Sequence, residues 1–219
     1  MKLIKAPGNL LCSILMVAHS ASAIVGGSDA SAGDAPFTVA IISSGFFGDT
    51  YICAGSLISS KSVLTTAGCV DGSSASSLKV RIGSLDHIAV TDIKPAGIAE
   101  KAALTGAPIK LYGWGSTAKL LDAKPRALQR LDTTFISADD CETAWSDDNP
   151  VTSNMNCDAA PEKNQGSCNG DQGGPVVNES GELVGIMGYY DYCEPHSNGR
   201  PDVNNDPVAA VDWIDLNTI

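Results

Sequence analysis

The sequence is poor in basic, aromatic and histidine residues. Its 219 residues include 14 Lys and Arg against 25 Asp and Glu, a formal net charge of −11, and only 5% are aromatic. Because phosphate binding needs a clustered basic face, the acidic balance argues against a nucleic-acid partner. Charged residues are only 18% and hydrophobic residues 43%, which argues against disorder and coiled coil. The length allows one domain or a tightly joined pair.

Long hydrophobic runs are absent, and the one short run near the start has another explanation. Residues 1–23 begin with Lys2 and Lys5, continue through an apolar run and end in Ala21-Ser22-Ala23, which predicts a secretory signal peptide. The run is shorter than the roughly 20 residues that span a bilayer, so we expect no membrane association once the signal is removed. Cleavage would leave residues 24–219 with 12 basic against 25 acidic residues, a formal charge of −13.

Six of the seven cysteines follow residue 23. An even number suits a disulfide framework in an oxidising compartment, so we expect an extracellular protein with neither a metal nor another cofactor. Asn178-Glu179-Ser180 is the only glycosylation sequon after the signal. It predicts an N-glycan on Asn178 if the host glycosylates, and an unmodified loop residue is the alternative.

Short apolar runs alternate with turn residues along the chain, as in residues 37–42, 62–65, 78–82 and 182–187. Runs of this kind favour an all-β sandwich or barrel over βαβ units. Helix is expected mainly at the C-terminal end, over Val208–Asn217, and a short helical turn over Ala96–Leu104.

Four separated motifs carry a more specific signal. They are Ile24-Val25-Gly26-Gly27, the segment from Cys53 to Cys69, Tyr112-Gly113-Trp114-Gly115 and Gly170-Asp171-Gln172-Gly173-Gly174. In order and content they resemble the secreted trypsin-like serine proteases (chymotrypsin fold, S1 type). The resemblance implies two packed antiparallel Greek-key barrels with a short C-terminal helix. It also implies three disulfides, which are Cys53 with Cys69, Cys141 with Cys157, and Cys168 with Cys193.

The catalytic residues of that family are missing from these motifs. Gly68 stands at the position of the His base and Gln172 at that of the Ser nucleophile. The connection that would carry the Asp is several dozen residues too short, and His87 and His196 lie outside the motifs, where surface positions are expected. Because loss of one principal triad member costs on the order of 10⁴–10⁶ in turnover, we expect no useful proteolysis.

The family's substrate pocket is also altered. The resemblance places Gly166 at the pocket floor, Tyr190 at a glycine of the mouth and Asp202 at a glycine of the wall, so we expect an occluded pocket. Asp171 is retained and is expected to pair with the freed N-terminal amine of Ile24, without a zymogen step. The N–H groups of Gly170 and Gln172 could still form a nest of the oxyanion-hole type.

Only four of the six strands expected in the first barrel are recognisable, so this barrel is predicted to be incomplete. A barrel that does not close leaves strand edges exposed. A defective paralogue or an incomplete gene model, with other or no function, is therefore the alternative. Sequencing the transcript across codons 84–96 would decide between a true deletion and a skipped coding segment.

A narrower resemblance suggests a role for an inactive chain. Ala32-Gly33-Asp34-Ala35-Pro36-Phe37, Ile93-Lys94-Pro95-Ala96-Gly97 and the motifs ending at Cys69 and Gly174 are similar to the glucanase inhibitor proteins of oomycete plant pathogens. The resemblance implies a secreted effector that binds a host endo-β-1,3-glucanase and suppresses glucan-elicited defence. The acidic charge is compatible with a basic partner. Residues 43–51 and 146–154 are candidate recognition loops.

Overall fold

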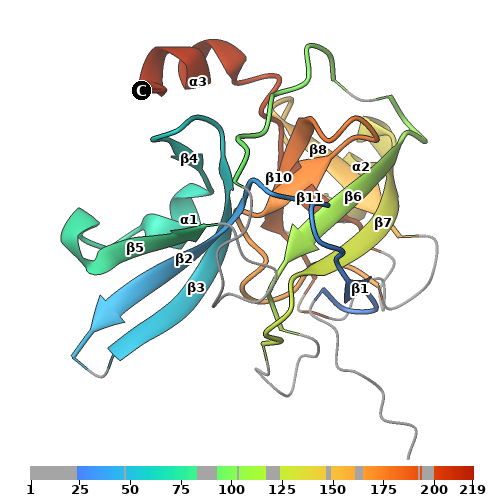
Figure 1. Cartoon of the computed structure of the whole chain (residues 1–219). Helices are drawn as coiled ribbons and strands as arrows, with labels where there is room; N and C mark the ends of the chain where they lie inside the picture. Colours follow the sequence, from blue (N-terminus) through green and yellow to red (C-terminus); the bar gives the residue numbers. More distant parts are fainter. Residues whose placement is uncertain are drawn as a thin grey trace, which may run out of the picture.

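The computed structural model describes residues 24–46, 48–82, 93–102, 104–116, 124–146, 149–160, 165–191, 193 and 200–219. The predicted signal peptide and the shortened connection at 83–92 lie outside these residues. The chain forms two β lobes side by side, with the C-terminal helix above the first (Figure 1). No described helix has the length and apolar character needed to cross a membrane.

The second lobe is a closed barrel. Its strands are β6 (Pro108–Gly113), β7 (Gln129–Phe135), β8 (Met155–Ala159), β9 (Pro175–Val177), β10 (Leu183–Tyr189) and β11 (Asp202–Asn205). They lie in the order β7-β6-β9-β10-β11-β8, and pairing of β7 with β8 closes the ring. The short β1 (Ser28–Asp29) adds to the outside of β7. Along β7 every second residue is buried, as expected when one face of an antiparallel strand lines a core.

The first lobe is half a barrel. Its described strands are β2 (Thr38–Gly45), β3 (Gly48–Leu57), β4 (Val63–Leu64) and β5 (Leu78–Ile82), in the order β4-β3-β2-β5. The predicted fold, with an incomplete first barrel, is therefore confirmed. The candidate recognition loop at residues 43–51 is instead mostly a β-hairpin, because β2 continues to Gly45 and pairs with β3 from Gly48.

Within the described residues, four short helical segments complete the fold. They are α1 (Ala67–Val70), the 3-10 turn η1 (Ala75–Ser77), α2 (Ala138–Trp145) and α3 (Val211–Asn217). The expected C-terminal helix is present but begins three residues later than predicted. Helix α2 was not predicted; it is capped by Ser137, whose side chain accepts a hydrogen bond from the N–H of Asp140 at 3.1 Å.

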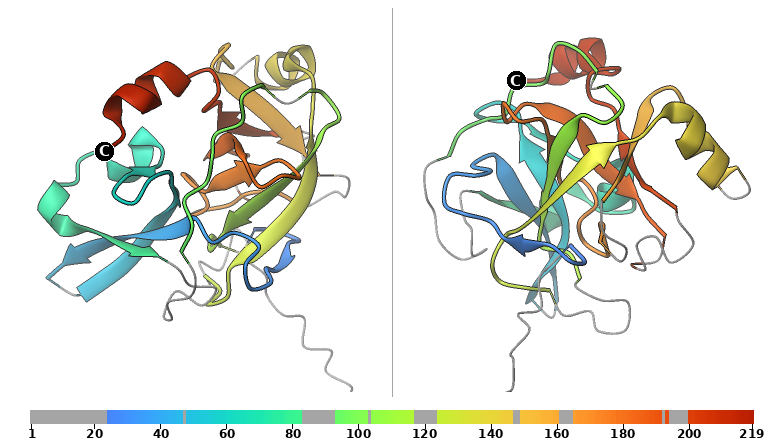
Figure 2. Two further views of the ribbon diagram at one scale, coloured as in Figure 1. Left: turned by 45° about the horizontal axis from the view of Figure 1, so that its top comes forward. Right: turned by 90° about the vertical axis from the view of Figure 1, so that its right-hand side faces the viewer.

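A shared core holds the lobes together. Its buried side chains come from both lobes and include Phe37, Val39, Leu57, Trp114, Leu128, Leu183 and Ile186. Residues 93–102 cross from the first lobe along one side of the second barrel (Figure 2). There the N–H of Ala96 donates to Leu57 and that of Ala99 to Leu183, at 2.8 and 3.0 Å. The predicted helical turn at 96–104 is therefore wrong, since the described part of this segment is extended and bonded to strands.

Three disulfides join these elements in the pairing implied by the family resemblance. Cys53–Cys69 connects β3 with α1, Cys141–Cys157 connects α2 with β8, and Cys168–Cys193 links the segment before Asp171 to the chain beyond β10. Each closes a loop of 16 or 25 residues. In the chain-entropy account, each bridge of this size contributes about 3 kcal/mol by restricting the unfolded chain.

Candidate functional site

Gly68 and Gln172 face a common cavity between the two lobes. The cavity has a volume of about 650 Å³. The first lobe contributes β3, β4, α1 and the residues before α1, the second contributes Gln172, β10 and β11, and the chain from Asp206 into α3 completes the lining. A Cβ added at Gly68 would meet no described atom within 4 Å. A residue with no proton-accepting group thus lies in open space at the position where the resemblance places the family's base.

The side chain of Gln172 is held by hydrogen bonds at both ends. Its Oε1 accepts from the N–H of Gly170 at 2.9 Å, and its Nε2 donates to the hydroxyl of Tyr190 at 2.9 Å. The Tyr190 hydroxyl donates in turn to Oδ1 of Asn169 at 2.6 Å. The N–H of Gly170, one of the two donors of the predicted nest, is therefore already bonded to the side-chain amide of Gln172 in the same loop. The Tyr190 hydroxyl is thus hydrogen-bonded to two residues of this loop, and the side chain is not turned away from it.

Asp171 is buried directly behind this loop. It is 0% exposed and accepts from the N–H groups of Gly115 and Cys168 at 2.8 and 2.9 Å. Burial raises the pKa of its carboxyl to about 7, although both hydrogen bonds act in the opposite direction. A Cβ at Gly113 or Gly115 would overlap this carboxylate. The glycines of the Gly-Trp-Gly motif are therefore required by the close approach of Asp171.

The segment that begins at Ile24 is docked into the second barrel. Ile24 is 0% exposed, and Val25 pairs with Gly166 through two backbone hydrogen bonds of 2.9 and 3.0 Å. In the 219-residue chain Ala23 precedes Ile24, so its nitrogen belongs to a peptide bond. The ion pair between the Ile24 amine and Asp171 stays a prediction about the processed protein.

Asp202 lies beside the predicted pocket floor. It is 3% exposed, and its Oδ2 accepts from the N–H of Ser167, the residue after Gly166, at 2.6 Å. Burial, and then the negative charge of Asp158, raise the pKa of Asp202 well above its usual value. The Asp202 carboxyl, at the wall position, thus binds the backbone N–H next to Gly166, the residue that the resemblance places at the pocket floor.

Asp158 lies next to Asp202 at this site, and the sequence did not indicate it. It faces Asp202 as its partner in the β8–β11 register and is 2% exposed. Its Oδ1 accepts from Nδ2 of Asn204 at 2.7 Å, and burial raises its pKa to about 6. Only the strand register, which pairs residues 44 positions apart, brings the two acids together.

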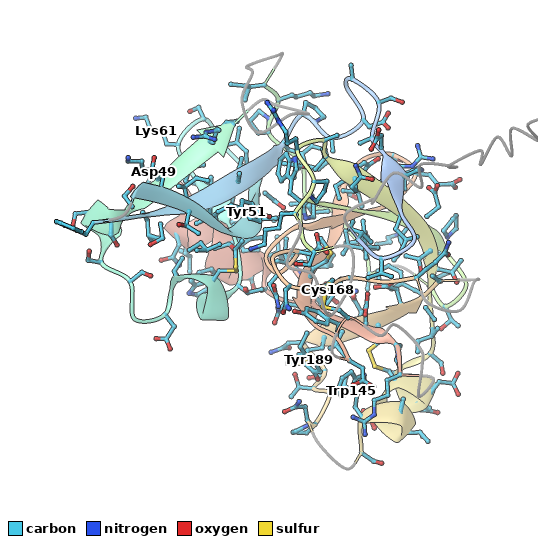
Figure 3. All side chains as sticks on the ribbon, turned by 90° about the horizontal axis from the view of Figure 1, so that it is seen from below. Asp49, Tyr51, Lys61, Trp145, Cys168 and Tyr189 are labelled. Atoms are coloured by element: carbon cyan, nitrogen blue, oxygen red, sulfur yellow. A yellow bond between two sulfur atoms is a disulfide. The ribbon has the colours of Figure 1, made fainter. Side chains whose placement is uncertain are left out.

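Aromatic contacts fix the loops on either side of the site. Tyr51 of β3 lies near the junction of the lobes (Figure 3) and donates its hydroxyl proton to the carbonyl of Gly170 at 2.7 Å. Trp145 of α2 and Tyr189 of β10 lie together, with ring centroids 5.0 Å apart in an edge-on contact. Tyr51 thus supports the loop that bears Gln172 from the first lobe, and the Trp145–Tyr189 contact joins α2 to β10.

Other predicted positions are separate from this site. Nδ2 of Asn178 donates to Glu182 at 2.8 Å in the turn before β10, and glycosylation there stays a prediction. His87 and His196 lie outside the described residues. Among the described residues, no group of three or more His, Cys, Asp or Glu is placed to hold a metal ion.

Comparisons with known proteins identify the family. The trypsin family model matches residues 24–98 and 89–214. The chain is 30% identical to chicken (Gallus gallus) trypsin II-P29 and 28% identical to Drosophila melanogaster trypsin delta, in each case over 87% of both chains. The structure superposes on mouse neuropsin, a serine protease, with a TM-score of 0.75 at 21% identity, over 90% of this chain and 100% of neuropsin. The chain therefore belongs to the trypsin family of serine proteases.

Proposed function

We propose that this trypsin-family chain is a secreted, proteolytically inactive homologue that acts by binding another protein. The observation that carries the proposal is the state of Gln172. Its amide has no nucleophilic oxygen comparable to a serine hydroxyl, and it bonds to Gly170 and Tyr190. Gly68, across the cavity, offers no group that could take a proton.

The altered pocket supports the same proposal. An extended substrate of a trypsin-like enzyme needs an open pocket, whereas here Tyr190 is bonded to Gln172 and Asn169, and Asp202 is bonded to Ser167. Keeping three disulfides and a rigid second barrel without catalytic groups fits selection for a stable surface. The partner we propose is a host plant endo-β-1,3-glucanase, whose inhibition would suppress the release of defence-eliciting glucan fragments.

Two assays test the proposal. The secreted protein is first incubated with casein and with a serine-directed phosphonate, with bovine trypsin as the positive control; cleavage or labelling would refute inactivity. Purified plant endo-β-1,3-glucanase is then assayed on laminarin with increasing amounts of the protein. We expect the glucanase activity to fall in a saturable way. Unchanged activity together with no retention of the enzyme on the immobilised protein would refute the proposed partner.

A further inference from the structure

The cavity between the lobes continues onto an exposed apolar face of α3. Trp213 lines the cavity and is 61% exposed, while Ile214, from the same helix, lines it and is only 4% exposed. Leu216 is 87% exposed and, at three residues from Trp213, shares its side of the helix. Large apolar side chains next to a cavity are a feature of recognition surfaces rather than of ordinary solvent-facing helices.

The lining of the cavity is mostly uncharged. Leu64, Ala67, Ile186 and Ala210 supply apolar surface from β4, α1, β10 and the turn before α3. Among the described residues that line it, Asp206 carries the only formal charge, and its Oδ1 already accepts from the N–H of Val208 at 2.8 Å. A volume of about 650 Å³ is within the range of pockets that bury a drug-sized ligand, so it has room for a large side chain. The cavity is thus suited to one large apolar side chain.

The charge around the cavity indicates which kind of residue would flank that side chain in the partner. The described residues that line the cavity include Asp206 and no Lys or Arg, and helix α3 exposes two further acidic residues, Asp212 and Asp215, and no basic one. The chain as a whole has 25 acidic against 14 basic residues. Acidic groups around an apolar opening favour basic residues on the approaching partner and disfavour acidic ones.

We propose that the cavity and the exposed face of α3 form a docking site for a basic polypeptide segment that inserts one large apolar side chain between the lobes. The inference rests on the proposed binding function and locates its surface. It assigns Gly68 a positive role, because a glycine there keeps open the space into which the partner's side chain enters. Trp213 then forms the rim that becomes covered on binding.

Tryptophan fluorescence gives a direct readout. Trp114 and Trp145 are 2% and 3% exposed, so acrylamide quenching of the folded protein reports mainly on Trp213. The probe is the acetylated and amidated peptide Lys-Lys-Phe-Lys-Lys, compared with the same peptide carrying Ala at the centre and with Glu-Glu-Phe-Glu-Glu. We expect the first peptide to protect Trp213 with a dissociation constant of about 0.1–1 mM, the range of a few kcal/mol. The two comparison peptides should bind at least tenfold more weakly.

Gly68→Leu fills the cavity and is expected to weaken binding of the first peptide at least tenfold. Its matched control is Gly45→Leu at the β2–β3 hairpin, where an added Cβ also meets no described atom within 4 Å. Trp213→Ala, a change on an exposed helix face, is a second variant whose folding does not depend on the cavity, and its binding is followed by heteronuclear NMR. Circular dichroism verifies that each variant is folded.

The outcomes separate this inference from the proposed function. No protection of Trp213 by the first peptide, or equal binding by Gly68→Leu and Gly45→Leu, would overturn the docking site even if the wild type inhibits glucanase. Selective binding of the basic Phe peptide that is lost in Gly68→Leu supports the site. If that result came with no effect on glucanase, the partner would be wrong and the docking site would stand.

Discussion

Replacing Asp158 with Asn is expected to stabilise the protein at pH 8 and to change its stability little at pH 4. Asp158 is 2% exposed, and burial raises its pKa from 3.8 to about 6. The folded protein therefore keeps a proton on this carboxyl where the unfolded chain has already released it. The free energy of unfolding contributed by this group falls as the pH rises from about 4 to about 6 and then stays low.

The size of the effect follows from the pKa difference. A rise of roughly two units, at about 1.4 kcal/mol per unit, corresponds to about 3 kcal/mol of lost stability above pH 6. Asn resembles the protonated acid, because its amide oxygen can still accept the 2.7 Å hydrogen bond from Asn204 and its NH₂ can donate. Asp202 keeps the part of its raised pKa that comes from burial, so the variant retains some pH dependence of its own.

Urea unfolding followed by circular dichroism at pH 4 and pH 8, with the disulfides intact, measures this difference. We expect Asp158→Asn to exceed the wild type by less than about 1 kcal/mol at pH 4 and by about 3 kcal/mol at pH 8. Asp215→Asn, which removes the same charge from an exposed position on α3, is the control and should show no such change. If the advantage of Asp158→Asn were equal at both pH values, the buried-acid explanation would be refuted.

Three further outcomes are expected. Gly173→Ala should destabilise the fold by more than about 2 kcal/mol in urea unfolding, because Gly173 has φ +78° and its Cβ would overlap the backbone of β3; a loss below 0.5 kcal/mol would contradict this reasoning. The paired change Cys53→Ala with Cys69→Ala, which opens a 16-residue loop, should cost about 3 kcal/mol by the same measurement, and an unchanged midpoint would contradict it. The paired change Gly68→His with Gln172→Ser should give less than about 1% of the turnover of trypsin on a fluorogenic arginine substrate, because the sequence predicts that the segment with the orienting Asp is missing; turnover above that level would disprove this.

The elements that local sequence patterns specify were predicted well. Strands such as β5 and β10 coincide with short apolar runs between turn residues, and the first lobe has the incomplete sheet expected from the short connection. Helix α2 was missed because only Cys141 and Trp145 of its eight residues are buried, so its apolar periodicity is weak. Ser137 before two acidic residues was the available signal, since this is the sequence of a capped helix start.

The parts of the site that depend on long-range contacts were not predictable. The family motifs predicted which positions Gln172 and Tyr190 occupy. They did not predict the hydrogen bond between them, because it depends on the conformations of two side chains 18 residues apart in the sequence. Asp158 lies one residue after a cysteine and gives no local sign of its pairing with Asp202. The helical turn expected at 96–104 failed because tertiary hydrogen bonds to Leu57 and Leu183 hold that segment extended.

The amide of Gln172 in the Gly170 nest has a consequence for how such proteins are found. Chemical proteomics of secreted fluids detects serine hydrolases through probes that react with a nucleophile and place an oxygen in this nest. Here the Gln172 side chain already accepts the N–H of Gly170 at 2.9 Å, so this N–H is not open to the oxygen of a probe. We therefore expect chains of this kind to escape activity-based probes however abundant they are, so that surveys by abundance or by affinity would be needed to count them.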